Sequence, residues 1–423
     1  MKLGFFSMPI HPVGRPLVDT LNEDREFAIL ADKLGFAEGL FGEHLTDAAE
    51  TVTSALIFIA WILRETKQIK LGSGTVNLPN HHPAMVAGEV AMLDHMSQGR
   101  FIFGISPGGL MSDAEIFGNL DRDRNAMLVE SINMILDLWT KEPPYNLAGQ
   151  FWNITVERTQ MLEIGQGYVH KPYQRPHPPI VVTAVAPFSK GVTEAAARGW
   201  DMISANFLLP QWVKTHWPKY VEGCERIGRK ADPADWRVAK SIFVAEDLNT
   251  ARRYATDPNG PYHAYYQSLA YKLVKGGRAN LFKRDQKAPD SSVTTEGVVN
   301  DLVIWGTPDK VAEDILKLRE EVGDFGTLYY AGHDWQDRKL ATRSLDQQST
   351  VHLPDFHSKK AAILAGLGFG WLPEWLIDEE LTRGTLVALP LKEGASHAFS
   401  PLLATRGSLG PAARELVDLV TKP

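Results

Sequence analysis

Residues 69–106 read IKLGSGTVNLPNHHPAMVAGEVAMLDHMSQGRFIFGIS, and their pattern identifies the fold class. Residues 69–78 form an apolar segment typical of a strand, residues 85–96 carry a helical pattern, and residues 101–106 form a second apolar strand. A strand, a helix and a strand joined by short connections predict a parallel βαβ unit.

The same alternation continues on both sides of this unit. Further strands are predicted at 3–8, 39–44, 180–184, 201–206, 237–245 and 326–331, and further helices at 52–64, 192–198, 211–226 and 307–322. With the two strands above, the count reaches eight. Eight parallel strands favour a (β/α)8 barrel over a doubly wound open sheet, so the predicted fold is an α/β TIM barrel with insertions.

Two insertions and a C-terminal extension depart from a plain barrel. Residues 143–179 are rich in proline, glycine and aromatic side chains, and residues 258–299 carry many charges. We expect the second insertion to be a long polar loop, either a lid over the active site or a surface excursion. A change of composition near Gln347 predicts a small, separate α/β extension, which divides the chain into domains 1–346 and 347–423.

Composition narrows the class of protein. The 423 residues include 44 basic and 51 acidic side chains, a net charge of −7, and no run of Lys or Arg, which argues against nucleic acid as a partner. The single cysteine, Cys224, excludes an intrachain disulfide and a thiolate metal cluster. No targeting signal is evident, and the longest apolar stretch, 55–63, is about half a membrane span, so we expect a soluble cytoplasmic protein without membrane contact.

In a TIM barrel the chemistry lies at the carboxyl ends of the strands. At one such end Glu43 and His44 are adjacent, so only one of them can point into the barrel. A histidine there is a natural proton donor or acceptor near neutral pH, and a core histidine bonded to backbone is the alternative. His81 and His82 have no carboxylate at a metal-binding spacing, so no metal site is predicted. The other strand ends are Met8, Asn77, Ser106, Ala184-Val185, Asn206 and His333-Asp334.

Two further features concern ligand binding. Residues 185–190 (VAPFSK) lead from a strand into a helix, where free N–H groups, the Ser189 hydroxyl and Lys190 predict an anion site; ordinary helix capping is the alternative. Gly74 lies inside a predicted strand, where a glycine permits the close approach of a flat ligand.

These residues resemble the bacterial-luciferase-like flavin monooxygenases. The resemblance covers residues 1–345 and is carried by GEH at 42–44, LPNHHPA at 78–84, LDHMSQGRFIFG at 93–104 and WGTP at 305–308. Within that family, GQFW at 149–152 and GHDW at 332–335 are most similar to the limonene and diketocamphane monooxygenase type.

The resemblance implies a two-component enzyme, expected to be a homodimer. Reduced FMN from a separate flavin reductase, together with dioxygen, would oxygenate a small apolar organic substrate through a flavin 4a-peroxide. His44 matches the catalytic histidine, and Gly74-Thr75 matches a pair joined by a non-proline cis peptide against the flavin ring. The other implied cofactor positions are Ser106 in the flavin pocket, Ala184, Val185 and Ser189 at the phosphate turn, and Asn125 at the ribityl chain or phosphate. The positions assigned to the substrate pocket are Phe6, Phe41, His82 and Trp152.

One departure from the family leaves the cofactor open. Luciferase has an arginine after the fourth strand that holds the phosphate, whereas this chain has Pro107 there. Phosphate affinity would then rest on the Ser189 turn with Lys190 or Arg175. The alternatives are a deazaflavin-dependent hydride-transfer oxidoreductase and a non-catalytic flavin-binding or ligand-binding protein.

The tail resembles a different family. Residues 365–373 (AGLGFGWLP), 380–389 (ELTRGTLVAL) and 411–420 are similar to the C-terminal part of the effector-binding domain of LysR-type regulators. No winged helix precedes them, so DNA binding does not follow from this resemblance. We expect the apolar faces of so short a tail to dock on the barrel or on a second copy of the chain, away from the flavin.

Overall fold

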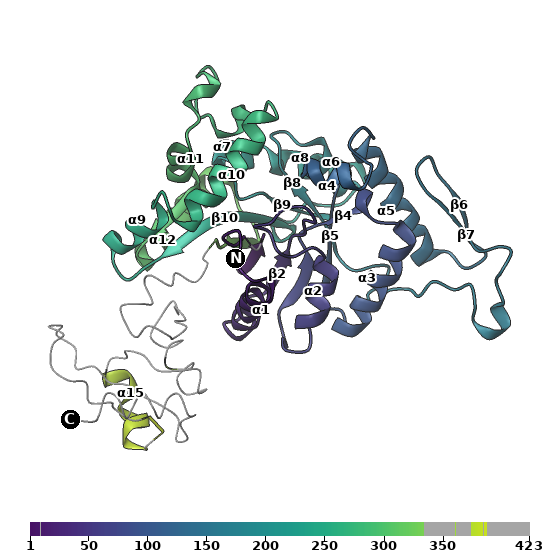
Figure 1. Cartoon of the computed structure of the whole chain (residues 1–423), viewed down its shortest axis with the longest axis horizontal. Helices are drawn as coiled ribbons and strands as arrows, with labels where there is room; N and C mark the ends of the chain where they lie inside the picture. Colours follow the sequence, from purple (N-terminus) through teal and green to yellow (C-terminus); the bar gives the residue numbers. More distant parts are fainter. Residues whose placement is uncertain (9, 334–359, 361–373, 384, 387–423) are drawn as a thin grey trace. The chain divides into compact units, whose positions relative to one another are not determined.

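The computed structural model describes residues 1–8, 10–333, 360, 374–383 and 385–386, and it divides into two compact units, Met1–Trp335 and Gln336–Pro423 (Figure 1). The described part of the second unit contains the helix α15 (Glu374–Thr382) and an ion pair of 2.8 Å between Nζ of Lys360 and Oε1 of Glu380. The predicted domain boundary at 346/347 and the tail segments 365–373 and 411–420 lie outside the described residues, as does the predicted docking of the tail.

Eight parallel strands close into a barrel in the first unit, which confirms the predicted TIM barrel. The ring runs β1, β2, β3, β5, β8, β9, β10, β12, and β12 pairs with β1 to close it. A short strand β4 continues β3 and pairs with β5, and β11 adds to β10 outside the ring. The bounds are β1 Lys2–Ser7, β2 Glu38–Phe41, β3 Lys70–Ser73, β4 Val76–Asn77, β5 Phe101–Ser106, β8 Ile180–Ala184, β9 Asp201–Ser204, β10 Trp236–Val244, β11 Val303–Gly306 and β12 Thr327–Ala331.

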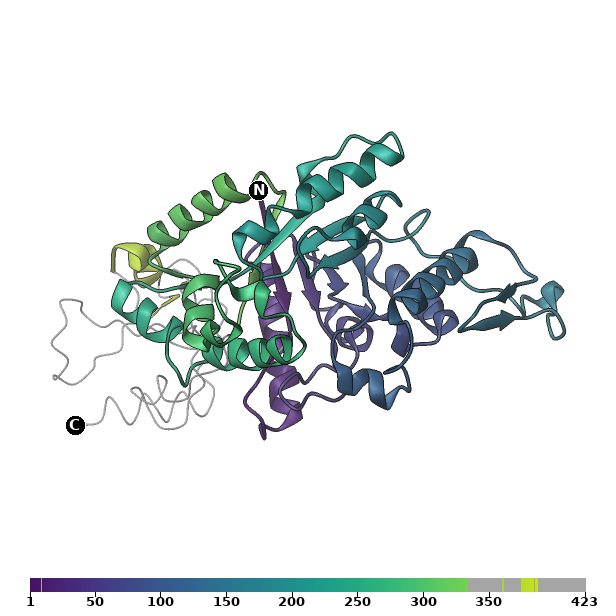
Figure 2. The same ribbon diagram turned by 90° about the horizontal axis from the view of Figure 1, so that it is seen from above.

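Helices surround these strands (Figure 2). One predicted helix, 211–226, is divided into two, because Pro218 has no N–H to give to the carbonyl of Lys214 and its ring would clash with that carbonyl. The bounds are α1 Leu17–Lys33, α2 Ala55–Ile62, α3 Pro83–Ser97, α4 Met111–Ile116, α5 Arg124–Thr140, α6 Lys190–Ala196, α7 Pro210–Val213, α8 His216–Arg226, α9 Leu248–Ala255, α10 Pro261–Lys275, α11 Thr295–Leu302 and α12 Pro308–Val322. Among the described residues, no helix is both long and apolar enough to cross a bilayer.

The interior of the barrel is layered along its axis. At the amino ends of the strands a buried Arg237 pairs with Glu38, with Nε to Oε2 at 2.7 Å and Nη2 to Oε1 at 3.1 Å. The Tyr329 hydroxyl donates to the same carboxylate at 2.6 Å. Above this layer is an apolar one, made of Leu40, Ile102, Val181, Ile203, Ala239 and Tyr329. These layers fill the barrel from below, so only its carboxyl-end mouth is left for chemistry.

The two insertions take different forms. Residues 143–179 carry an antiparallel hairpin of β6 (Asn146–Ala148) and β7 (Asn153–Thr155). The expectation of a long polar loop at 258–299 is wrong, because this insertion contains α10, α11 and two short 3-10 turns. Tyr262, Tyr265 and Tyr266 stand at helical spacing on α10, and their burial in a separate apolar cluster stabilises the helix.

Candidate active site

His44 lies just beyond the carboxyl end of β2, between two buried carboxylates. Its Nδ1 is 2.9 Å from Oδ2 of Asp113 on α4, its Nε2 is 3.4 Å from Oε2 of Glu50, and its side chain is 15% exposed. Asp113 also accepts the backbone N–H of Thr46 at 2.9 Å and its hydroxyl at 2.5 Å. The ring is therefore fixed on one side and in contact with a second acid on the other.

The surroundings shift the pKa values of the two carboxylates in opposite directions. Against the cost of burial, hydrogen bonds from Thr46 and His44 lower the pKa of Asp113, so this group is ionised at neutral pH. Burial raises the pKa of Glu50, and the nearby His44 and Lys272 offset this effect only in part. An ionised Asp113 accepts a hydrogen bond from Nδ1–H and so fixes the tautomer of His44.

Glu43 organises the loops around His44. Its carboxylate accepts the N–H groups of Ala55 and Asn77, each at 3.1 Å, and lies 3.0 Å from Nε2 of His81. Burial opposes the charging of His81, but the Glu43 carboxylate outweighs it and raises the pKa of that ring. Glu43 thus joins α2, β4 and the following turn. Within the described ranges, no three His, Cys, Asp or Glu side chains are grouped to hold a metal ion.

A chain of hydroxyls joins the ends of β4 and β5. Thr75 donates from Oγ1 to Oγ of Ser106 at 2.7 Å, and Ser106 donates to Oδ1 of Asn77 at 2.8 Å. The peptide bond between Gly74 and Thr75 is cis, as the resemblance implied. Ser106 is therefore a neighbour of Gly74 and Thr75 at the barrel mouth, although it lies 31 residues after Thr75 in the chain.

The turn after β8 leads into α6. Ser189 stands at the helix N-cap, and its side chain makes no capping hydrogen bond. Arg278, from the turn after α10, donates from Nη2 to the carbonyl of Val185 at 2.6 Å. Ala184, the last residue of β8, is fully buried. A hydroxyl and a guanidinium at one turn form a donor set suited to an anion.

No contact among the described residues joins Asn125 to these groups. Asn125 is exposed on α5, and its N–H is taken by the carboxylate of Asp123 at 3.1 Å. Because an acid already caps this helix end, the arrangement does not favour Asn125 as a phosphate ligand. Its neighbour Arg124 reaches the turn after β5, where it donates to the carbonyl of Gly108 at 3.1 Å.

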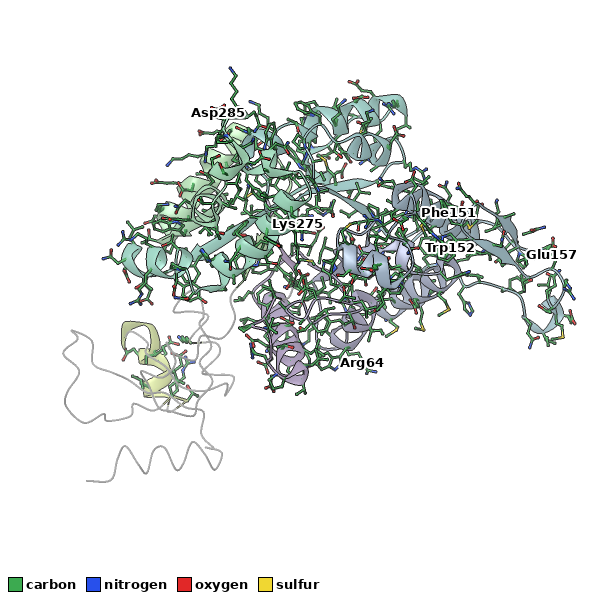
Figure 3. The ribbon with its side chains drawn as sticks, turned by 45° about the horizontal axis from the view of Figure 1, so that its top comes forward. Arg64, Phe151, Trp152, Glu157, Lys275 and Asp285 are labelled. Carbon is green, nitrogen blue, oxygen red and sulfur yellow. The ribbon has the colours of Figure 1, made fainter. Side chains whose placement is uncertain are left out.

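The predicted substrate residues lie in three places. Phe6 faces the barrel interior, where a Cβ added to Gly74 would be 3.1 Å from its ring. His82 and Trp152 pack edge to face with 5.3 Å between ring centroids, and Figure 3 shows Trp152 on the side that carries the hairpin, away from Lys275 at the end of α10. Phe41 is fully buried, with its ring 4.8 Å from a phenylalanine of α2, so it is a core residue between barrel and helix.

Helix α10 is joined to the loop that carries His44. Nζ of Lys272 lies 2.9 Å from Oδ2 of Asp47 and 3.9 Å from Oε1 of Glu50. The second insertion, although helical, therefore contacts the acid that touches Nε2 of His44.

Sequence reasoning missed Asp113, Glu50, Lys272 and Arg278. A carboxylate on a short helix and a lysine on an amphipathic one look like solvated surface residues. Arg278 carried a weak signal, since it follows Gly276-Gly277 in an insertion next to the predicted mouth. Apart from that of Glu50 with the nearby His44, their side-chain contacts join residues 67 to 225 positions apart, so no local pattern predicts them.

Comparisons with known proteins agree with this arrangement. A family model described as luciferase-like monooxygenase matches residues 1–324, and one described as LysR substrate binding domain matches residues 325–422. The 4-hydroxyprotoasukamycin monooxygenase of Streptomyces nodosus subsp. asukaensis is 29% identical over 382 residues, which are 88% of this chain and 96% of that protein. The limonene 1,2-monooxygenase of Rhodococcus erythropolis is 30% identical over 372 residues, 86% of this chain and 89% of that protein.

A solved structure matches most of the chain. It is the oxygenating constituent of 3,6-diketocamphane monooxygenase of Pseudomonas putida, a type II Baeyer-Villiger monooxygenase in complex with FMN, with 25% identity and a TM-score of 0.72 over 82% of this chain and 96% of that chain. A putative coenzyme F420-dependent oxidoreductase of Mycobacterium tuberculosis is 24% identical over 302 residues, 67% of this chain and 85% of that protein. The chain therefore belongs to the luciferase-like monooxygenase family and carries a LysR substrate-binding match at its C-terminus.

Proposed function

We propose that this chain is the oxygenase component of a two-component monooxygenase that receives reduced FMN from a separate reductase and oxygenates an apolar organic substrate. The observation that carries the proposal is His44 at the barrel mouth, held by Asp113 and in contact with Glu50. Dependence on a reductase and on reduced nicotinamide nucleotide is the reason to propose a cytoplasmic location.

The residues at the mouth fit a flavin mononucleotide. Thr75 and Ser106 carry hydroxyls next to the cis peptide of Gly74 and Thr75, where the flavin ring is proposed to lie. Ser189 and Arg278 provide a hydroxyl and a cation for a phosphate. When bound and reduced, FMN supplies the electrons that activate dioxygen for transfer to the substrate.

His44 is proposed to move the proton that this chemistry requires. Asp113 accepts a hydrogen bond from Nδ1–H, so Nε2 is the atom that accepts or gives a proton, and Glu50 at 3.4 Å is the proposed partner in that exchange. Replacing His44 by alanine should leave flavin affinity within a few-fold and lower oxygenation by about 10²-fold, the scale of a lost acid-base group. Unchanged oxygenation in this variant would contradict the role.

The function is tested by supplying the full chain with reduced FMN from an independent reductase under ¹⁸O₂. Limonene and 2,5-diketocamphane serve as probes, and incorporation of ¹⁸O into product is measured by mass spectrometry. Incorporation that requires FMN supports the proposal. Turnover with reduced coenzyme F420 and no oxygen uptake would favour hydride transfer, an alternative kept because an F420-dependent relative matches the chain. Flavin binding without turnover of any probe would favour a non-catalytic binding protein.

The phosphate position is tested by comparing FMN with riboflavin. We expect Arg278→Gln and Ser189→Ala each to weaken FMN binding by about 1–3 kcal/mol, as for a lost hydrogen bond to a charged group, and to leave riboflavin binding unchanged. Lys190→Gln tests the second cation predicted for this site, an exposed lysine on the same turn. Equal affinity of the wild type for FMN and riboflavin would move the phosphate elsewhere.

We further propose that the homodimer forms through an apolar face of α2 and α3. Ile57 is 74% exposed and Met92 61%, and Trp61 and Met85 are exposed on the same two helices. Such a patch is typical of a protein interface. Met92→Lys should convert a dimer to monomer in analytical ultracentrifugation, whereas Leu316→Lys on the exposed side of α12 should not. A monomeric wild type would exclude the proposal.

A further inference from the structure

A second polar cluster occupies the barrel mouth at the ends of β9, β10 and β12. It consists of Asn206, Ser241 and His333 from the strand ends, and of Tyr265 and Tyr266 from α10. All five side chains are buried, and the His333 side chain is stacked on Tyr265 with 3.7 Å between ring centroids. Buried polar groups at this end of a barrel are candidates for ligand contact.

The hydrogen bonds within this cluster can be counted. Tyr265 donates to Oδ1 of Asn206 at 3.2 Å, and Asn206 donates from Nδ2 to Oγ of Ser241 at 3.2 Å. Ser241 Oγ is also 2.8 Å from the Tyr266 hydroxyl and 3.1 Å from Nε2 of His333. Every polar side chain of the cluster thus has a hydrogen-bond partner, and the Ser241 hydroxyl has no further hydrogen bond to offer.

One atom of the cluster has no partner. Nδ1 of His333 is buried and makes no hydrogen bond to any described residue. Burial lowers the pKa of this ring to about 3, so it is neutral at physiological pH, and Nδ1 is either a bare acceptor or an unused N–H donor. A buried polar atom without a hydrogen-bond partner lowers the stability of the fold, unless a bound ligand supplies the partner.

The cluster adjoins the proposed catalytic residues. Every second residue of a strand faces the same side, so residues 329, 331 and 333 share the inward side of β12 and of the residues just after it. Tyr329 lies in the apolar layer, and residue 333 lies nearer the mouth. Helix α10, which carries Tyr265 and Tyr266, also carries Lys272, whose Nζ lies 3.9 Å from Oε1 of Glu50. Glu50 in turn touches His44. Helix α10 therefore contacts both the acid beside His44 and the ring of His333.

We propose that Nδ1 of His333 hydrogen-bonds an oxygen carried by the substrate, so that the enzyme selects an otherwise apolar cyclic alcohol or ketone over the corresponding hydrocarbon. The inference rests on the proposed function, since it concerns the molecule to be oxygenated. Ser241 orients the ring through Nε2, and Tyr265 supports it face to face. A site built to pair with an oxygen rejects the analogue that lacks it, because the site's polar atom is then left unpaired.

Limonene, carveol and carvone test this preference, because they share one carbon skeleton and differ by no oxygen, a hydroxyl or a carbonyl. Binding to the FMN-loaded full chain is measured by calorimetry. We expect the wild type to bind carveol or carvone at least about tenfold tighter than limonene, the scale of one hydrogen bond to a buried group. If only carveol binds more tightly than limonene, Nδ1 accepts a hydrogen bond. If carveol and carvone both bind more tightly, Nδ1 donates one.

Two variants separate a contact from a structural role. Asparagine at this position keeps a polar atom where Nδ1 lies, and glutamine keeps one where Nε2 lies. We therefore expect His333→Asn to retain the preference and His333→Gln to lose it. Tyr262→Phe is the matched control, because Tyr262 is edge-on to His333 but its hydroxyl donates to the Ile242 carbonyl.

The outcomes are distinct. The inference is overturned if the wild type does not bind the oxygenated ligands more tightly than limonene. It is also overturned if His333→Asn and His333→Gln lose this preference to the same extent. If the preference holds while none of the three compounds is oxygenated with reduced FMN, the recognition site stands and the proposed function fails. If limonene is oxygenated and no preference is found, the function stands and the recognition site fails.

Discussion

Replacing Asp113 with asparagine tests how the fold controls His44. In the wild type, Oδ1 of Asp113 accepts the Thr46 N–H and hydroxyl, and Oδ2 is 2.9 Å from Nδ1 of His44. An amide has one oxygen, and the two donors of Thr46 hold that oxygen in place. The new NH2 group then faces His44, so Nδ1 must accept and the ring proton moves to Nε2.

This change of tautomer sets the expected magnitude. Exchanging a charged acceptor for a neutral one costs about 1–2 kcal/mol of unfolding free energy. The larger effect is catalytic, because Nε2 then carries a proton when it should accept one. We expect oxygenation to fall by about 10²-fold, close to the effect of losing the acid-base group altogether. Flavin affinity should change little.

The assay is product formed per reduced FMN consumed, with hydrogen peroxide measured as the uncoupled fraction. Ser112→Ala is the matched control, because the Ser112 hydroxyl lies 2.6 Å from that of Thr46 but does not touch His44. A double-mutant cycle with His44→Ala completes the test. If Asp113→Asn lowers oxygenation by the same factor with and without His44, Asp113 does not act through this histidine and the reasoning is refuted.

Three further predictions concern stability. Glu38→Gln should lower the free energy of unfolding by about 3 kcal/mol in denaturant titration, since it leaves the buried Arg237 only partly compensated; a loss near zero would contradict a paired charge at the barrel floor. Against the cost of burial, three backbone N–H groups lower the pKa of Asp32, so its contribution is present above about pH 4 and lost below it. Asp32→Asn should therefore cost about 1 kcal/mol near neutral pH, and the difference from wild type should vanish in acid. Gly104→Ala should lower the melting temperature by several degrees, because the new Cβ would overlap the Ser73 carbonyl; an unchanged melting temperature would show that the strands separate freely.

Much of the fold follows from local pattern. The eight barrel strands and most helices were predicted from two patterns. Strands buried on both sides form short apolar runs, and in the helices between them apolar residues recur every three to four positions. The polar loop predicted at 258–299 was wrong, since charges and glycines masked the tyrosine face of α10. The pattern was present in Tyr262, Tyr265 and Tyr266, but the surface that buries them comes from distant segments.

The sequence by itself determined the barrel, the family and the position of His44, because strand ends in a closed parallel barrel must meet at one mouth. It did not determine what His44 contacts. Asp113 is 69 residues away, and Lys272 reaches Asp47 over 225 residues. Such pairs are set by how loops of different strands converge, which no local periodicity encodes. The same holds for His333, whose unpaired Nδ1 becomes meaningful only once Ser241 and the tyrosines of α10 are packed around it.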